Sequence, residues 1–201
     1  MPQGEPYLMT CSLISSWNYI FNAYEGYEDE AYKSFLRTLR REPSEPTQAM
    51  QAGIDFEDAI NAVVEGKAEP QSECIKKIAG IVSGGQPQVK LYKDIKIGGM
   101  DFLLYGRLDY LKSGTIYDIK FSKNYEVGKF YSSAQHPFYL TLCPESNRFE
   151  YLISDGNDVF IETYTRETAE STSKIISVFI QWLKDTGNID TYVNKWGTIY
   201  E

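Results

Sequence analysis

Two acids and a lysine stand close together near the middle of the chain. The sequence reads Gly-Arg-Leu-Asp-Tyr at 106–110 and Ile-Tyr-Asp-Ile-Lys at 116–120, with a Ser-Gly turn between the two stretches. Both stretches alternate with a period of two, so they predict the arms of a β-hairpin. Side chains alternate between the faces of a strand, so Asp118 and Lys120 share a face, and the turn can bring Asp109 within a few residues of them. The pattern indicates an active site carried by this hairpin.

The tripeptide Asp-x-Lys alone is weak support, because the chain contains it twice. Asp94-Ile95-Lys96 repeats it one strand earlier, without an acid-bearing strand before it. The preceding Gly-x-x-Asp arm therefore distinguishes the second copy from the first.

A third acid, Glu57, stands on a predicted helix that begins after Thr47 and stops at Gly66. Glu57 falls inside the apolar arc of this helix, whose other members are Met50, Gly53, Ile54, Ile60 and Val64. Burying an unpaired carboxylate costs about several kcal/mol, so we expect a cation beside it. The alternative is a structural ion pair between Glu57 and an arginine under the sheet.

Three converging carboxylates predict a divalent metal ion. Glu57, Asp109 and Asp118 would repel one another and raise their own pKa values unless a cation neutralised them. Hard oxygen ligands suit Mg²⁺, with Mn²⁺ able to substitute. Such an ion can polarise a phosphate and lower the pKa of a bound water. Lys120 would orient or deprotonate the attacking water and stabilise the pentacovalent state.

A further helix is predicted after Lys120, and it carries Gln135 and Tyr139 four residues apart on one face. The two side chains can therefore act together on one partner, and Pro137 must lie in the first turn. The alternative is a helix cap followed by a core tyrosine. His136 is the single histidine of the chain, and we interpret it as a surface residue or as a support for the ligands rather than a general base.

Other elements must surround and position these residues. The spacing of apolar residues predicts N-terminal helices within about 10–66, a short helix over 71–82, and a C-terminal helix within about 166–186 whose inner face carries Ile175, Ile176, Phe179, Ile180 and Leu183. Strands are predicted at 88–97, 148–154 and 159–164. The closing segment, with Tyr192, Trp196 and Tyr200, is expected to pack on the body of the protein. We expect residues 1–201 to form a single domain.

Composition favours a globular protein with an unevenly distributed charge. The 201 residues are 42% hydrophobic and 24% charged, with a net charge of −8. An acidic chain is unusual for a DNA-binding protein, but Arg107, Lys112, Lys120, Lys123 and Lys129 form a local basic island. Its three cysteines are isolated, so we expect buried free thiols. Neither a leader nor a membrane span is indicated, and we expect a cytoplasmic protein without a membrane partner.

The ordered set of motifs resembles the PD-(D/E)XK nuclease superfamily, and within it the RecB-type branch that includes phage recombination exonucleases. The matching pieces are Gly53-Ile-Asp-Phe-Glu57, Gly106-Arg-Leu-Asp109, Asp118-Ile-Lys120 and Gln135-His-Pro-Phe-Tyr139. The resemblance implies an α/β fold with a restriction-endonuclease-like core, in which a central mixed sheet is flanked by helices in α-β-β-β-α-β order. It further implies that the carbonyl of Ile119 completes the metal shell, and that Gln135 and Tyr139 position the DNA strand and support the lysine.

Two departures from that pattern bear on cofactors. Glu57 stands where many RecB-type members have a histidine, so the metal shell would consist of oxygen alone. The four cysteines that hold an iron-sulfur cluster in part of the branch are missing, so we expect no cluster.

The expected function is metal-dependent hydrolysis of DNA, with an exonuclease of DNA repair or recombination, of phage origin, favoured over an endonuclease. Arg107, Lys123 and Lys129 would contact the DNA backbone beside Gln135 and Tyr139. Self-association and a recombination partner protein are left open. The alternatives are a catalytically silent module that binds nucleic acid or protein on the same fold and, third, a metal-dependent enzyme acting on a small molecule.

Overall fold

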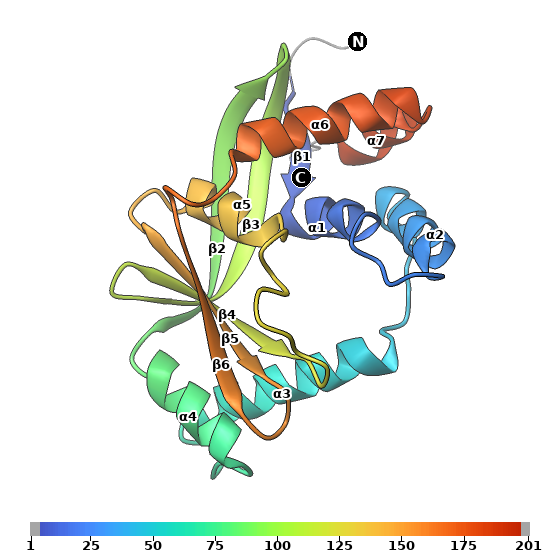
Figure 1. The fold of residues 1–201 in the computed structure, drawn as a ribbon. Helices are drawn as coiled ribbons and strands as arrows, with labels where there is room; N and C mark the ends of the chain where they lie inside the picture. Colours follow the sequence, from blue (N-terminus) through green and yellow to red (C-terminus); the bar gives the residue numbers. More distant parts are fainter. Residues whose placement is uncertain (1–4, 198–201) are drawn as a thin grey trace.

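The computed structural model describes residues 5–197, which are built around one six-stranded mixed sheet with helices on both faces (Figure 1). The strands are β1 (Tyr7–Thr10), β2 (Gln86–Ile97), β3 (Met100–Lys112), β4 (Thr115–Phe121), β5 (Arg148–Ser154) and β6 (Val159–Thr165). They lie in the order β1-β3-β4-β5-β6, and β2 also pairs with β3. The pairs β1–β3 and β4–β5 are parallel, whereas the other three are antiparallel.

Seven helices are described: α1 (Cys11–Tyr19), α2 (Glu28–Leu39), α3 (Gln48–Val64), α4 (Glu73–Val82), α5 (Gln135–Leu142), α6 (Thr172–Asp185) and α7 (Ile189–Trp196). The predicted fold class is confirmed. Helices α3 and α4 precede β2, β3 and β4, and α5 then leads to β5, which gives the predicted α-β-β-β-α-β order.

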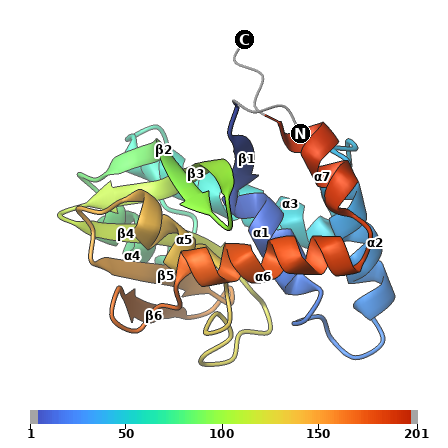
Figure 2. The ribbon, with the colours of Figure 1, turned by 90° about the horizontal axis from the view of Figure 1, so that it is seen from above.

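The sheet separates two apolar clusters. The larger lies under α1, α2, α5, α6 and α7, and includes Trp17, Phe35, Phe149, Tyr151, Phe179 and Tyr192. The smaller lies under α3 and α4, and includes Ile60, Ile78, Tyr110, Ile119 and Leu152. Successive residues of β5 enter opposite clusters, as the period of two requires. Seen from above, α6 runs along the same side as α1 and α5 (Figure 2).

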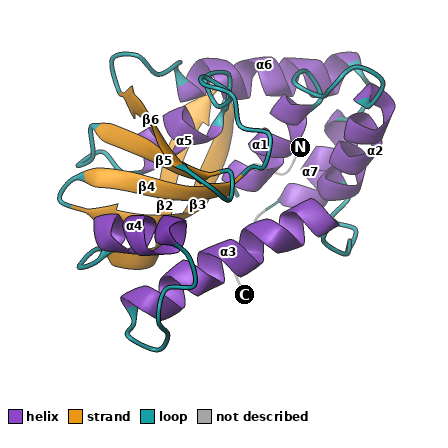
Figure 3. Cartoon of the chain, turned by 60° about the horizontal axis from the view of Figure 1, so that its bottom comes forward, coloured by secondary structure: helices purple, strands orange, loops and turns teal. Residues whose placement is uncertain are grey.

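Helix α3 begins and ends as predicted but does not bury the predicted arc. The Thr47 hydroxyl accepts a hydrogen bond from the Met50 amide at 3.2 Å, and Gly66 has a φ of +69° after the helix end. Ile60 is buried, whereas Met50 is 59% exposed and Ile54 is 45% exposed. Figure 3 shows the reason: the first half of α3 extends past the sheet toward α2.

Two further differences from the sequence expectations concern the N-terminal part of the chain, whereas the expectation for the closing segment agrees with the structure. The helical spacing of Leu13, Trp17, Ile20, Phe21 and Tyr24 predicts a first helix that continues to Gly26. The helix ends at Tyr19 instead, and Phe21 and Tyr24 are exposed. Strand β1 was not predicted. The closing segment does pack on the body, because the Tyr192 hydroxyl donates to the Leu8 carbonyl and the Trp196 indole donates to the Leu39 carbonyl. Tyr200 lies outside the described residues.

Two local distortions open the sheet beside the candidate site. Strand β3 pairs with β4 through Tyr110–Lys112 and Thr115–Tyr117, so the two strands part before they reach Asp109 and Asp118. On the other side of β3, the ladder with β2 passes from Pro87↔Tyr110 to Val89↔Leu108. Gln88, between those pairs, has a φ of +52°, which is uncommon for a residue with a Cβ.

The cysteine expectation is confirmed: Cys11, Cys74 and Cys143 are free and buried. Within residues 5–197, no helix has both the length and the apolarity needed to cross a membrane.

Candidate active site

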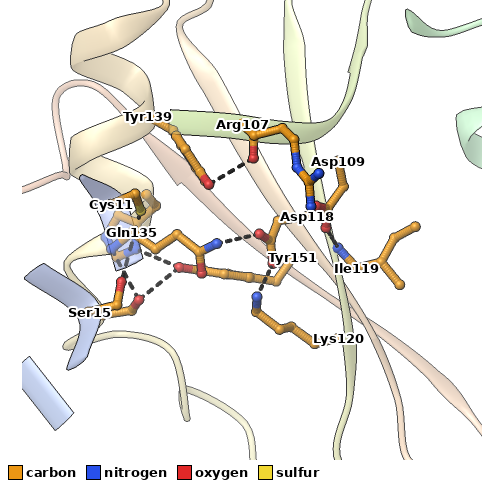
Figure 4. A network of polar contacts seen from close by, with 12 residues as sticks. Cys11, Ser15, Arg107, Asp109, Asp118, Ile119, Lys120, Gln135, Tyr139 and Tyr151 are labelled. Atoms are coloured by element: carbon orange, nitrogen blue, oxygen red, sulfur yellow. Dashed lines mark hydrogen bonds and ion pairs between the residues drawn. The ribbon is translucent and has the colours of Figure 1, made fainter. Parts of the chain in front are cut away.

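An ion pair between Asp118 and Lys120 lies at the centre of the site (Figure 4). Asp118 Oδ2 is 2.6 Å from Lys120 Nζ. The aspartate side chain is 3% exposed, whereas that of the lysine is 30% exposed. Strand β4 therefore holds a buried carboxylate against an ammonium group that still reaches solvent.

Helix α5 contacts both strands of the hairpin, through two side chains. Gln135 Nε2 donates to Asp118 Oδ1 at 2.5 Å, and the Tyr139 hydroxyl donates to the Arg107 carbonyl at 2.9 Å. The two residues lie on one helix face but hold different strands. Tyr139 is 6% exposed, as the alternative of a core tyrosine expects, so it fixes α5 on β3 and does not reach the surface.

Gly106 allows this close approach of α5 to β3. A Cβ at position 106 would lie 2.5 Å from Tyr139 Cε1 and 2.8 Å from Leu142 Cδ1, inside the contact distance of real atoms. The glycine of the Gly106-Arg-Leu-Asp109 motif is thus required by packing.

Gly106→Ala should lower the free energy of unfolding by about 1–3 kcal/mol, because the buried Tyr139 ring has to move. Urea unfolding measures this change. The matched control is Gly53→Ala on α3, where nothing lies within 4 Å of the added Cβ. That control should stabilise the protein by about 0.5–1 kcal/mol, since alanine favours a helix interior. Equal stabilities of the two variants would contradict the packing role.

Asp109 bridges the gap between the parted strands. Its Oδ2 accepts a hydrogen bond from the Ile119 backbone amide at 2.8 Å, so a side chain replaces the missing ladder bond. The structure therefore places Asp109 directly beside the residue that follows Asp118.

Glu57 is held by a residue that the sequence did not indicate. Its Oε1 accepts a hydrogen bond from Gln88 Nε2 at 2.7 Å, so its partner is a neutral amide and not the arginine of the alternative. Gln88 stands at the distorted position of β2 opposite Asp109. A glutamine within an alternating strand carries no local signal for such a contact.

The three acids affect one another although each has its own partner. Burial raises the pKa of Asp109 well above its usual value, and the charge of Asp118 adds to the rise. Burial also raises the pKa of Asp118, against the opposing effects of Lys120 and Gln135. The pKa of Glu57 is raised by burial and by the charge of Asp118, despite the Gln88 hydrogen bond. All three carboxyls are thus held above their ordinary pKa.

The same charges keep Lys120 protonated. Burial alone lowers the pKa of Lys120, but the charges of Asp118 and Asp109 outweigh burial and raise it above the ordinary value. The side chain is therefore an ammonium ion at neutral pH.

The three acids offer the type of ligand atom that a hard divalent cation prefers, but their spacing suits such a cation less well. Glu57, Asp109 and Asp118 supply oxygen ligands, and Asp118 Oδ2 is a buried oxygen that accepts no hydrogen bond beyond its contact with Lys120. Within residues 5–197, however, no three acids, cysteines or histidines lie close enough together to hold a metal ion. The three acids are neighbours without forming a closed ligand set.

Three of the predicted basic residues are accessible to a ligand. Arg107 and Lys123 are exposed, and exposed Lys129 contacts the Ser122 hydroxyl at 2.8 Å. The charge of Arg107 lowers the pKa of Glu57, which places the guanidinium near that acid.

His136 is not a surface residue. It is 4% exposed, its ring stacks on Tyr164 at 4.0 Å between centroids, and Nδ1 lies 3.4 Å from the Tyr151 hydroxyl. Burial lowers the pKa of His136 to about 4, against the opposing charge of Glu162. The prediction of a surface position was therefore wrong. Tyr164, which covers the His136 ring, comes from β6, and the local sequence around His136 does not reveal that contact.

Acid should destabilise the protein through His136. Its pKa lies below the unfolded value near 6.5, so the unfolded chain binds the proton more tightly and stability is lost as the pH falls through this range. The expected loss from pH 7 to pH 5 is about 2 kcal/mol. Urea unfolding at both pH values should show this difference in the parent and not in His136→Phe, which retains an aromatic ring. The raised acids act with the opposite sign in both proteins and cancel in the comparison; identical pH dependences would refute the assignment.

The fold of the chain is similar to those of two solved structures. A structure described as SSO0001 superposes with a TM-score of 0.55 at 13% identity, covering 91% of this chain and 78% of that chain. LHK-Exo in complex with dAMP gives a TM-score of 0.45 at 15% identity, covering 89% of this chain and 92% of that chain. The first similarity shows a shared fold. No protein-family model and no curated protein sequence matches the chain.

Proposed function

We propose that this protein hydrolyses phosphodiester bonds of DNA with the help of Mg²⁺, for which Mn²⁺ can substitute. The observation that carries the proposal is the buried Asp118 carboxylate paired with a solvent-reaching Lys120, next to two more acids of raised pKa. An ion pair with a purely structural role does not need two further acids beside it. The repulsion among the three carboxylates lowers the stability of the fold. Acids kept together against repulsion are typical of a functional site.

In this proposal Glu57, Asp109, Asp118 and the carbonyl of Ile119 hold the cation, which supplies positive charge beside the scissile phosphate. Lys120, which lies against Asp118, orients or deprotonates the attacking water and stabilises negative charge on the phosphate. Gln135 orients Asp118, and Tyr139 holds the hairpin in place through Arg107. Arg107, Lys123 and Lys129 guide the DNA backbone.

We further propose an exonuclease of DNA repair or recombination, acting as one domain over residues 1–201. The test is digestion of end-labelled linear DNA beside closed circular DNA, with Mg²⁺ or Mn²⁺ and with EDTA. Metal-dependent loss of the linear DNA with an intact circle is expected. Cutting of the circle would make the protein an endonuclease, and no digestion of either would refute the nuclease.

A specific observation also favours a second function, that of a binding module without catalysis. Lys120 already neutralises Asp118, and the described acids do not form a closed ligand set. Such a module would bind DNA equally with and without a divalent ion and would release no product.

A further inference from the structure

A large cavity opens close to Asp118, with the side chain of Gln135 between them. It has a volume of about 1130 Å³ and lies between the second half of α1 and the segment 124–133. Ser15 and Gln135, both labelled in Figure 4, line its inner end. Because Gln135 donates to Asp118, the cavity begins one side chain away from the ion pair.

The walls are aromatic and rich in amides, with little charge. Tyr19, Tyr24 and Tyr125 contribute rings, and Asn18, Asn22 and Asn124 contribute side-chain amides. Tyr19 is 49% exposed and Tyr24 is 64% exposed, so their rings are available to a ligand. One acid, Glu126, and one base, Lys129, are the charged residues of the lining within the described part of the chain.

The two sides of the cavity are fixed to each other. Asn18 Nδ2 donates to the Ser132 carbonyl at 2.7 Å, and the Ser132 hydroxyl donates to Asn22 Oδ1 at 2.8 Å. The outer loop is also held from behind, because buried Glu162 accepts hydrogen bonds from the Tyr125 hydroxyl at 2.8 Å and from the Gly128 amide at 3.0 Å. The cavity is therefore formed before any ligand arrives, which reduces the ordering cost of binding.

We propose that this cavity takes unpaired bases of a single DNA strand whose backbone passes the Asp118–Lys120 pair. Exposed tyrosine rings provide faces on which the bases of a single strand can stack. A duplex presents only base edges in its grooves, so it cannot use stacking platforms of this kind. The inference rests on the proposed function, and it specifies single-stranded DNA as the substrate.

The surroundings favour a strand over a protein segment. Exposed Lys129 in the lining, with exposed Lys123 close by in sequence, suits a phosphate backbone. The volume slightly exceeds the usual ~300–1,000 Å³ of a small-molecule pocket, as expected for more than one base.

The experiment compares the double variant Tyr19→Ala/Tyr24→Ala with Tyr27→Ala. Tyr27 is 60% exposed and does not line the cavity, so it is matched in residue type and exposure. Fluorescence anisotropy at low ionic strength measures the binding of a labelled oligo(dT), an abasic strand of the same length and a duplex, in EDTA and in Ca²⁺. The abasic strand carries the same charge and separates base stacking from phosphate contacts.

We expect the parent and Tyr27→Ala to bind oligo(dT) about 5- to 100-fold more tightly than the abasic strand. The double variant should lose this preference. Equal binding of the two strands by the parent, an unchanged double variant, or tighter binding of the duplex would overturn the proposal. Base-dependent binding by a parent that does not cleave DNA would refute the nuclease and leave the base site. Cleavage of DNA by a parent without base preference would refute the base site and leave the nuclease.

Discussion

Asp118→Ala should lower the rate of metal-dependent DNA cleavage by at least ~100-fold, because it removes a proposed metal ligand and the partner that orients Lys120. The variant loses the ion pair at 2.6 Å and the hydrogen bond from Gln135. Its Lys120 side chain is 30% exposed and can turn toward water, so the fold should survive. Gel assays with end-labelled DNA measure the rate.

Asp118→Asn separates the loss of charge from the loss of shape. It keeps the size of the side chain and an oxygen for Gln135 but turns its amide nitrogen toward Lys120, whose partly exposed ammonium can move into water. Its urea midpoint should therefore stay above that of Asp118→Ala while its cleavage rate falls as for alanine. A slow but folded Asn variant supports a chemical role.

The chain offers a matched control in its other Asp-x-Lys tripeptide. Asp94 is exposed on β2, and Lys96 pairs with Asp101 at 3.4 Å and not with Asp94. Asp94→Ala should therefore cleave DNA like the parent. If Asp118→Ala also cleaves at the parental rate, the active site lies elsewhere.

The sequence was most informative where local geometry determines the answer. A period of two places Asp118 and Lys120 on one face of β4, and the observed ion pair agrees with that placement. Thr47 caps α3 because capping depends on residues within one turn. The order of helices and strands could be predicted for the same reason.

The sequence was least informative where distant segments meet. The contact between Glu57 and Gln88 depends on a positive φ inside a strand, and the burial of His136 depends on Tyr164. The apolar residues at the start of α3 show that an arc on a helical wheel does not reveal how far the sheet extends. Strand β1 was missed because four residues are too short for a recognisable period.

The cavity beside α1 could not be predicted from the sequence either, because its aromatic lining comes from segments about 100 residues apart. The metal-ligand roles of Glu57, Asp109 and Asp118 and the single domain stay predictions. They depend on measurements with the ion and on the intact chain.

Lys120→Ala distinguishes the nuclease from the silent module. In both cases the substitution leaves Asp118, 2% exposed, without its cationic partner. In a silent module nothing else neutralises that carboxylate, so the variant should lose about 3–5 kcal/mol of stability, with or without Mg²⁺. In a nuclease the ion binds the folded acids, so Mg²⁺ should raise the Tm of the variant at least as much as that of the parent.

Cleavage by Lys120→Ala should nevertheless fall by at least ~100-fold, because the ammonium that stabilises charge on the phosphate is gone. The measurements are thermal melts with Mg²⁺ and with EDTA beside a cleavage assay, for the parent, Lys120→Ala and Lys96→Ala. Lys96 belongs to the other tripeptide and its side chain is 68% exposed, so Lys96→Ala should match the parent in both. A parent that shows neither a Mg²⁺-induced rise in Tm nor cleavage would refute the nuclease and leave the binding module.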